Sequence, residues 1–162
     1  PDTPEEAEQA RERMAFEELF LFQLRSIANR RQALQQKAPV IRFEPEVVKR
    51  FVDSLPFELT NDQKVAAFEI LKDLEKKYPM NRLLNGDVGS GKTVVALTAA
   101  YQTSLQQKQV VFMAPTEILA QQHFKTTASL ISNSQLPSPS NQILRIGLLT
   151  GSEAKISYGN RE

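Results

Sequence analysis

The feature that most constrains this 162-residue chain is a glycine-rich octapeptide at residues 86–93, Gly-Asp-Val-Gly-Ser-Gly-Lys-Thr. It matches the pattern G-x-x-x-x-G-K-[ST] at every fixed position, between a short apolar stretch and a helix-forming run. Glycines let the backbone turn tightly and aim its N–H groups at phosphate oxygens, and a helix start adds a positive dipole end. A chance match in this length is about one in two hundred. The octapeptide therefore predicts a nucleoside-triphosphate site.

The positions of this loop have separate expected roles. Lys92 is placed for the β- and γ-phosphates and the Thr93 hydroxyl for Mg²⁺, so these two are the candidate catalytic residues and Thr93 the candidate metal ligand. The expected cofactors are ATP or ADP with Mg²⁺. The other expected nucleotide-binding positions in the loop are Gly86, Asp87, Val88, Gly89, Ser90 and Gly91. The alternative interpretation is a glycine-rich turn that happens to carry a lysine.

The acidic residues after the loop are as informative as the loop. Phosphoryl transfer also needs an acidic residue that holds Mg²⁺ and polarises water, usually at the end of a later strand. After Asp87 there is no aspartate, and the only glutamates are Glu117, Glu153 and Glu162, none of which ends an apolar run. We therefore expect a fragment of a longer ATPase that does not hydrolyse ATP at a useful rate alone.

The N-terminal segment predicts one long helix over residues 4–38. Thr3 and Glu6 form a capping-box pattern, Pro4 suits the first helical position, and no glycine or proline follows until Pro39. At 1.5 Å per residue this helix is about 50 Å long, longer than a compact domain of this size needs. It is either a packing helix of the same lobe or a connector to a neighbouring domain, and we favour the connector.

The rest of the chain reads as alternating helices and strands. We expect helices from Pro45 to before Pro56, at 60–78, after the loop to about residue 107, and at 115–131. Apolar strands are expected at 83–84, 110–114 and 143–149, with a surface loop at 132–142. The order strand–helix–strand–helix–strand implies an α/β fold with a parallel sheet and right-handed crossovers. The predicted domains are residues 1–40, the long helix, and residues 41–162, part of a P-loop lobe.

Composition excludes several classes of protein. A formal charge of +1 argues against a polybasic tail that binds nucleic acid by charge alone. The absence of cysteine excludes disulfides, thiol nucleophiles and Cys-based metal sites, and a single histidine, His123, excludes a His-rich one. His123 itself is expected to be a partly exposed helix residue. With no long apolar run and no signal-peptide pattern, we expect a soluble, cytoplasmic chain with no membrane partner.

Three segments together carry a family resemblance: the loop at 86–93, Ala-Pro-Thr-Glu-Ile-Leu-Ala at 114–120 and Leu-Leu-Thr-Gly-Ser at 148–152. They resemble motifs of the superfamily 2 helicases. With Leu-Pro-Phe-Glu-Leu-Thr-Asn-Asp-Gln at 55–63, Tyr-Pro-Met-Asn-Arg-Leu-Leu-Asn at 78–85 and Ala-Phe-Glu-Glu-Leu-Phe at 15–20, nearly the whole chain is similar to the RecG family. Ser90 and Glu117 favour that family over the transcription-repair coupling translocases.

The resemblance implies a function and a fold. RecG proteins are bacterial ATP-dependent DNA helicases that remodel replication forks and Holliday junctions in recombination and repair. The implied fold is the first part of RecA-like motor lobe 1, preceded by the connector helix from a DNA-binding wedge domain. The implied partner is branched or forked DNA, and the implied state is a monomer in the bacterial cytoplasm. The wedge domain and the second motor lobe would lie outside these residues.

The resemblance also assigns site residues, each with a competing structural role. Gln63 is similar to a glutamine that reads adenine, with Phe57 and Leu59 near the base, but Thr60 and Gln63 also make a capping-box pattern. The implied DNA-contact residues are Pro115, Thr116, Glu117, Thr150, Gly151 and Ser152. Thr116 is equally suited to an ordinary helix N-cap, and the segment 150–152 to a solvated turn.

Two other functions stay open at this stage. One is a P-loop kinase or ATPase that never meets nucleic acid, and the other is a non-catalytic interaction module built on the long helix. Two segments also depart from the family pattern. The predicted loop at 132–142 is longer than its counterpart, and the residues after Ser152 lack the expected Lys/Arg-rich helix.

Overall fold

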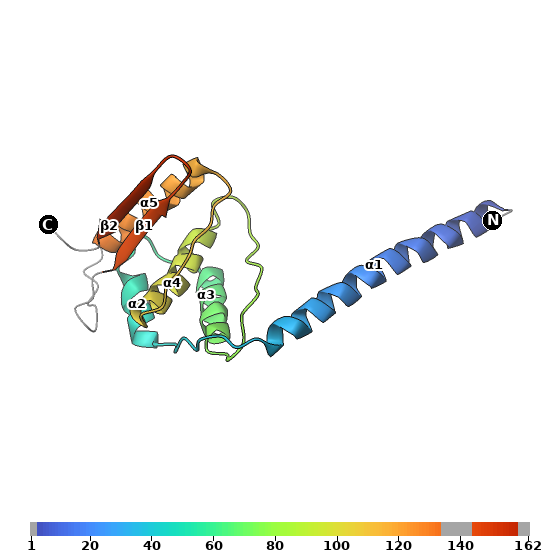
Figure 1. Cartoon of the computed structure of the whole chain (residues 1–162), viewed down its shortest axis with the longest axis horizontal. Helices are drawn as coiled ribbons and strands as arrows, with labels where there is room; N and C mark the ends of the chain where they lie inside the picture. Colours follow the sequence, from blue (N-terminus) through green and yellow to red (C-terminus); the bar gives the residue numbers. More distant parts are fainter. Residues whose placement is uncertain (1–2, 134–143, 159–162) are drawn as a thin grey trace. The chain divides into compact units, whose positions relative to one another are not determined.

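The structure is a computed structural model that describes residues 3–133 and 144–158 (Figure 1). The chain divides into two compact units. One comprises residues 1–39 with 76–80, and the other residues 40–75 with 81–162. The boundary between the first unit and the rest of the chain falls at Pro39, where the sequence changes from helix-forming to extended.

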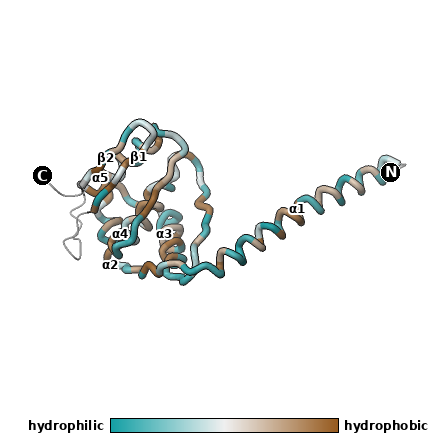
Figure 2. The backbone as a smooth tube through the Cα atoms, viewed as in Figure 1, coloured by the Kyte–Doolittle hydropathy of each residue, from teal (hydrophilic) through white to brown (hydrophobic). Residues whose placement is uncertain are grey.

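The first unit is dominated by α1, Pro4–Gln35. The Thr3 hydroxyl accepts a hydrogen bond from the backbone N–H of Glu6 at 3.2 Å, which caps the helix as its sequence predicts. No residue of α1 is buried, and the Phe16 and Phe20 rings stack on its surface with centroids 5.8 Å apart. Figure 2 shows hydrophilic and hydrophobic residues mixed along the whole helix. Its apolar side chains are spread around the helix rather than gathered on one face.

The described residues of the second unit form the helices α2 (Pro45–Asp53), α3 (Asn61–Leu74), α4 (Lys92–Leu105) and α5 (Glu117–Asn133). A hydrophobic core cluster lies between α2 and α4, where Val47 and Phe51 pack on Leu97 and Tyr101. The Phe51 and Tyr101 rings stack with centroids 4.6 Å apart. This core fixes α4, and therefore the direction in which the chain leaves the glycine-rich loop.

Polar side chains tie extended segments to the helices. Arg82 donates from Nε and Nη2 to Asp73 Oδ2 at 2.9 and 2.7 Å and from Nη1 to Glu69 Oε2 at 2.5 Å. These bonds attach residues 81–85, which lead into the glycine-rich loop, to α3. On the other side of the unit, Gln102 and Gln106 of α4 both donate side-chain N–H groups to the carbonyl oxygen of Arg42.

A two-stranded antiparallel hairpin follows α5. Strand β1, Arg145–Leu149, pairs with β2, Ala154–Tyr158, so that Arg145 lies opposite Tyr158 and Leu149 opposite Ala154. A backbone bond of 2.8 Å from Thr150 N to Glu153 O closes the connecting turn. The sequence interpretation missed β2, although the residues from Lys155 to Tyr158 alternate polar and apolar as a half-buried strand does.

The expected parallel sheet does not form within the described residues. Segments 83–84 and 110–114 are extended without strand pairing, and the side chains of Leu83, Val111 and Met113 are 90%, 77% and 87% exposed. Parallel strands need hydrogen-bonding neighbours and cover on both faces. The only strand ladder in the described part of the chain pairs β1 with β2. The segments 83–84 and 110–114 therefore have no hydrogen-bonding neighbour strand there, and they are not covered on both faces.

The remaining differences between expectation and structure are small. The helices predicted from sequence are present and end two to four residues earlier than the C-terminal limits drawn for α1, α3 and α4. The predicted loop at 132–142 begins within the last residues of α5, and its remainder lies outside the described residues. None of the described helices is long and apolar enough to cross a membrane.

Candidate functional site

The glycine-rich loop adopts a backbone that its glycines make possible. Gly89 and Gly91 have φ values of +82° and +80°, in the left-handed region that side chains disfavour. A bond of 3.2 Å from Ser90 N to Asp87 O closes the turn 87–90, which contains Gly89. Gly91 is the N-cap of α4, so the loop ends directly at the positive end of a 14-residue helix.

The Lys92 ammonium group lies over the loop. Its Nζ donates to the carbonyl oxygens of Gly86 and Asp87 at 2.8 and 2.7 Å. The first N–H groups of α4, those of Lys92 and Thr93, have no carbonyl within the helix to bond. A cation and helix-terminal N–H groups therefore meet at a glycine-rich turn, which is the donor set that suits a polyphosphate.

Gln63 connects the loop to the start of α3. Its Oε1 accepts from the Thr60 backbone N–H at 2.9 Å, and its own backbone N–H donates to Thr60 Oγ1 at 3.3 Å, so the capping box is confirmed. Its Nε2 donates to the Ser90 carbonyl oxygen at 2.9 Å. One side chain therefore caps a helix and binds the loop. Near it, Leu59 is buried whereas Phe57 is 48% exposed, so of these two only Phe57 presents an open apolar surface to a base.

The two segments expected to contact DNA lie against each other. Thr116 caps α5, because its Oγ1 accepts from Leu119 N at 3.3 Å. The next residue, Glu117, reaches the hairpin turn, where its Oε1 accepts from Ser152 N at 2.9 Å and its Oε2 from Ser152 Oγ at 3.2 Å. Residues 35 positions apart are thus joined, and no local sequence pattern predicted the link. Pro115 is exposed beside the cap.

Hydrogen bonding changes the acidity of Glu117. The Ser152 backbone N–H, then the Ser152 hydroxyl, lower the pKa of the Glu117 carboxyl from its ordinary value of 4.5. The turn itself is closed by Thr150, whose Oγ1 accepts from Glu153 N at 3.0 Å. The segment 150–152 is therefore an exposed hairpin turn with an anchored carboxylate beside it.

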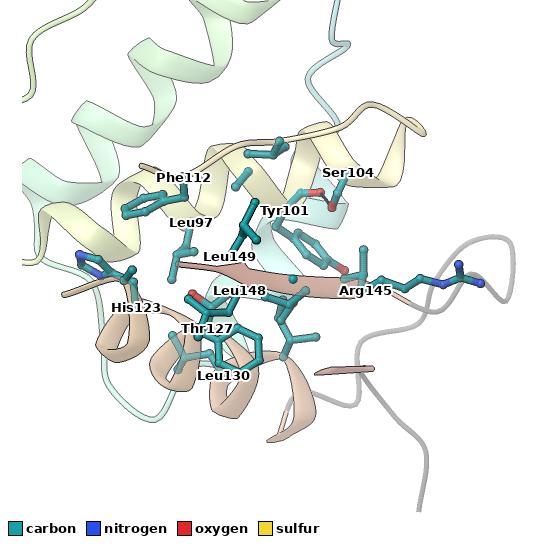
Figure 3. Close-up of a pocket in the computed structure, with 18 of the residues that line it drawn as sticks. Leu97, Tyr101, Ser104, Phe112, His123, Thr127, Leu130, Arg145, Leu148 and Leu149 are labelled. Carbon is teal, nitrogen blue, oxygen red and sulfur yellow. Dashed lines mark hydrogen bonds between the residues drawn. The ribbon is translucent and has the colours of Figure 1, made fainter. Parts of the chain in front are cut away.

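A hollow that no residue of the loop lines lies elsewhere in the described residues. It is an apolar cavity of about 230 Å³ between α4, α5 and β1, bounded by Leu97, Tyr101, Phe112, Leu130 and Leu148 among others (Figure 3). No residue of 86–93 lines it, so it is distinct from the glycine-rich loop. The half-buried His123 also borders it and meets the Phe112 ring edge-on at 4.9 Å between centroids, which confirms its expected place on a helix.

The described residues contain no cluster of three or more His, Cys, Asp or Glu side chains that could hold a metal ion by themselves.

A family model of the DEAD/DEAH box helicases matches residues 60–157, more than half of the chain. The chain belongs to this family. It is 40% identical over 146 residues to the ATP-dependent DNA helicase RecG of Aquifex aeolicus (strain VF5), covering 90% of this chain and 18% of that protein. It is 47% identical over 131 residues to RecG of Bacillus subtilis (strain 168), covering 80% of this chain and 19% of that protein.

A solved structure is similar as well. The structure of a RecG protein bound to a three-way DNA junction matches with a TM-score of 0.71 and 45% identity, covering 82% of this chain and 18% of that one. The chain thus spans about a fifth of the length of these relatives. The resemblance expected from the motifs is confirmed, and with it the helicase-type fold.

Proposed function

We propose that this chain is the connector helix and the first part of motor lobe 1 of an ATP-dependent DNA helicase that remodels branched DNA. The observation that carries the proposal is the glycine-rich loop, with two left-handed glycines, Lys92 folded over it and α4 starting at its end. The matches to RecG helicases support DNA as the partner of the complete protein.

In this proposal the loop binds ATP or ADP. The Lys92 ammonium exchanges two carbonyl oxygens for phosphate oxygens, which carry more negative charge and attract it more strongly. The N–H groups at the start of α4 face the same phosphates. Thr93 supplies a hydroxyl to Mg²⁺, which neutralises charge on the phosphates when it is bound. Phe57 and Gln63 contact the adenine base, a role supported by the exposed Phe57 ring and by the bond from Gln63 to the loop.

The domain roles are part of the same proposal. Residues 1–40 connect to a DNA-binding wedge domain, and residues 41–162 begin a RecA-like lobe in a monomeric bacterial cytoplasmic enzyme. Exposed apolar side chains at 83–84 and 110–114 support a parallel sheet that is completed by strands from elsewhere in the longer protein. The segments 115–117 and 150–152 together build the surface that contacts one DNA strand, through a capped helix start and an exposed turn.

The test is DNA-stimulated ATP hydrolysis by the longer protein that carries these residues. We expect little turnover without DNA, strong stimulation by forked or junction DNA, and loss of both in Lys92→Ala. Turnover that no DNA changes would favour a P-loop ATPase or kinase outside nucleic-acid metabolism.

A further inference from the structure

Glu117 is bonded to the hairpin turn in a way that is inconsistent with direct contact between Glu117 and DNA. Its carboxylate lies among residues expected to meet phosphates, and like charges at short range repel. Both of its oxygens are already used, by Ser152 N at 2.9 Å and Ser152 Oγ at 3.2 Å. A phosphate at the same place would have to displace the carboxylate or lie beside it.

The internal bonds of the turn show what the carboxylate adds. Thr150 Oγ1 accepts from Glu153 N, and Thr150 N donates to Glu153 O, so the turn keeps its shape without Glu117. The bonds from Ser152 to Glu117 instead determine where the turn lies relative to the start of α5. Gly151 leaves room for this approach, since a Cβ there would stand 3.3 Å from Glu117 Oε1.

We propose that Glu117 is a positioning residue: it holds the turn 150–152 against the N-terminus of α5, so that Thr116 and the turn form one strand-contact surface. Glu117 itself does not contact DNA. This inference rests on the proposed function, because it assigns a role within the DNA-contact segments. It replaces the expectation that Glu117 meets the strand directly.

The first test measures DNA-stimulated ATPase activity in the longer protein with three variants. Glu117→Gln retains an oxygen that can accept from Ser152 N, whereas Glu117→Ala retains none. Glu153→Ala is the control, because it removes the same charge from the same turn but from a side chain that pairs with Lys155.

We expect Glu117→Ala to raise the DNA concentration for half-maximal stimulation about tenfold, the factor that a lost charged hydrogen bond of this kind commonly gives. The maximal rate at saturating DNA should change little, because the loop at 86–93 is untouched. Glu117→Gln and Glu153→Ala should stay close to the unmodified protein.

Three results would overturn the inference. Tighter DNA binding by Glu117→Ala would mean that the carboxylate competes with phosphate. Equal losses of DNA affinity in Glu117→Gln and Glu117→Ala would mean that the charge of Glu117 is required. Unchanged DNA affinity in both variants would mean that the contact is unimportant. Absence of DNA stimulation in the unmodified protein would instead contradict the proposed function.

If the unmodified protein shows no DNA stimulation, a second measurement still tests the contact between Glu117 and Ser152. In the 162-residue chain, amide hydrogen exchange at Ser152 should become faster in Glu117→Ala and stay slow in Glu117→Gln. Unchanged exchange in Glu117→Ala would show that Ser152 N–H does not depend on this carboxylate.

Discussion

At Gly91, the backbone conformation and a neighbouring side chain both require glycine. Its φ of +80° disfavours any side chain, and a Cβ there would lie 2.3 Å from Gln63 Nε2. Gln63 uses that nitrogen to bind the Ser90 carbonyl, so the space beside Gly91 is part of the link between the loop and α3. Glycine at this position therefore serves the turn and the contact together.

Alanine substitutions at the two left-handed glycines separate these effects. Gly89→Ala and Gly91→Ala share the backbone strain, about 1–2 kcal/mol, but a Cβ at Gly89 meets nothing within 4 Å. We expect Gly91→Ala to lower the free energy of unfolding by more than Gly89→Ala, as measured by urea titration. Equal losses would show that Gln63 moves aside freely.

The lowered pKa of Glu117 predicts a pH dependence of the hairpin contact. Because the pKa in the folded chain lies below the ordinary value of 4.5, the stabilisation is complete above about pH 4.5. It is lost as the pH falls through the folded pKa and the carboxyl becomes protonated. The Ser152 amide resonance should shift over that acidic range, below pH 4.5. A resonance that does not change over this range would contradict the contact.

At the scale of single residues, sequence patterns predicted the features that depend only on neighbouring residues. The N-cap at Thr3, the capping box at Thr60 and the left-handed glycines of the loop are set by residues a few positions apart. The contact of Glu117 with Ser152 joins different elements, so no spacing rule finds it. The capping role of Gln63 is confirmed, and its nitrogen also binds the Ser90 carbonyl, while its role toward adenine stays a prediction.

Among the elements, α4 is the one that connects the glycine-rich loop to the core of the second unit. It begins at the loop, packs on α2 through Leu97 and Tyr101, and buries Thr98 and Gln102 completely. Movement of α4 would therefore move the first N–H groups that face the phosphate site. Stability of the α2–α4 core and geometry of the loop should change together.

Truncation of Phe51 tests that dependence. Its side chain is 2% exposed and stacks on Tyr101, so Phe51→Ala should lower the free energy of unfolding by about 3–5 kcal/mol. Nucleotide binding should weaken as the core loosens. Phe22→Ala on α1, where the side chain is 68% exposed, is the control and should cost less than about 0.5 kcal/mol. Similar unfolding free energies for the two variants would mean that this core does not hold the unit.

Helices were predicted better than strands for a physical reason. A helix satisfies its backbone within its own segment, so caps and helix-forming residues suffice to locate it. A strand needs a partner that its own residues do not specify. Val110–Ala114 has the composition of a buried strand and remains unpaired in the described residues, whereas the polar tail after Ser152 pairs with β1.

At the scale of the whole molecule, the long helix α1 and residues 86–93 belong to different compact units. None of the residues of α1 is buried, and the buried core residues in the described part of the chain all lie within 41–148. We therefore expect the unit after Pro39 to fold without α1.

Deletion of residues 1–36 tests this directly. The shortened chain should keep its unfolding free energy within about 0.5 kcal/mol and its ADP affinity, as measured by thermal unfolding and calorimetry. A clear loss of either quantity would show that α1 supports the rest of the chain.

The central claim is that residues 86–93 form a working phosphate site within this chain. Titration of Mg-ADP by calorimetry, with Lys92→Ala as the matched variant, tests it most directly. The account predicts that the chain binds ADP and that the variant binds at least about tenfold more weakly, a loss of about 1.4 kcal/mol. ADP binding of equal strength by both forms, or by neither, would contradict it.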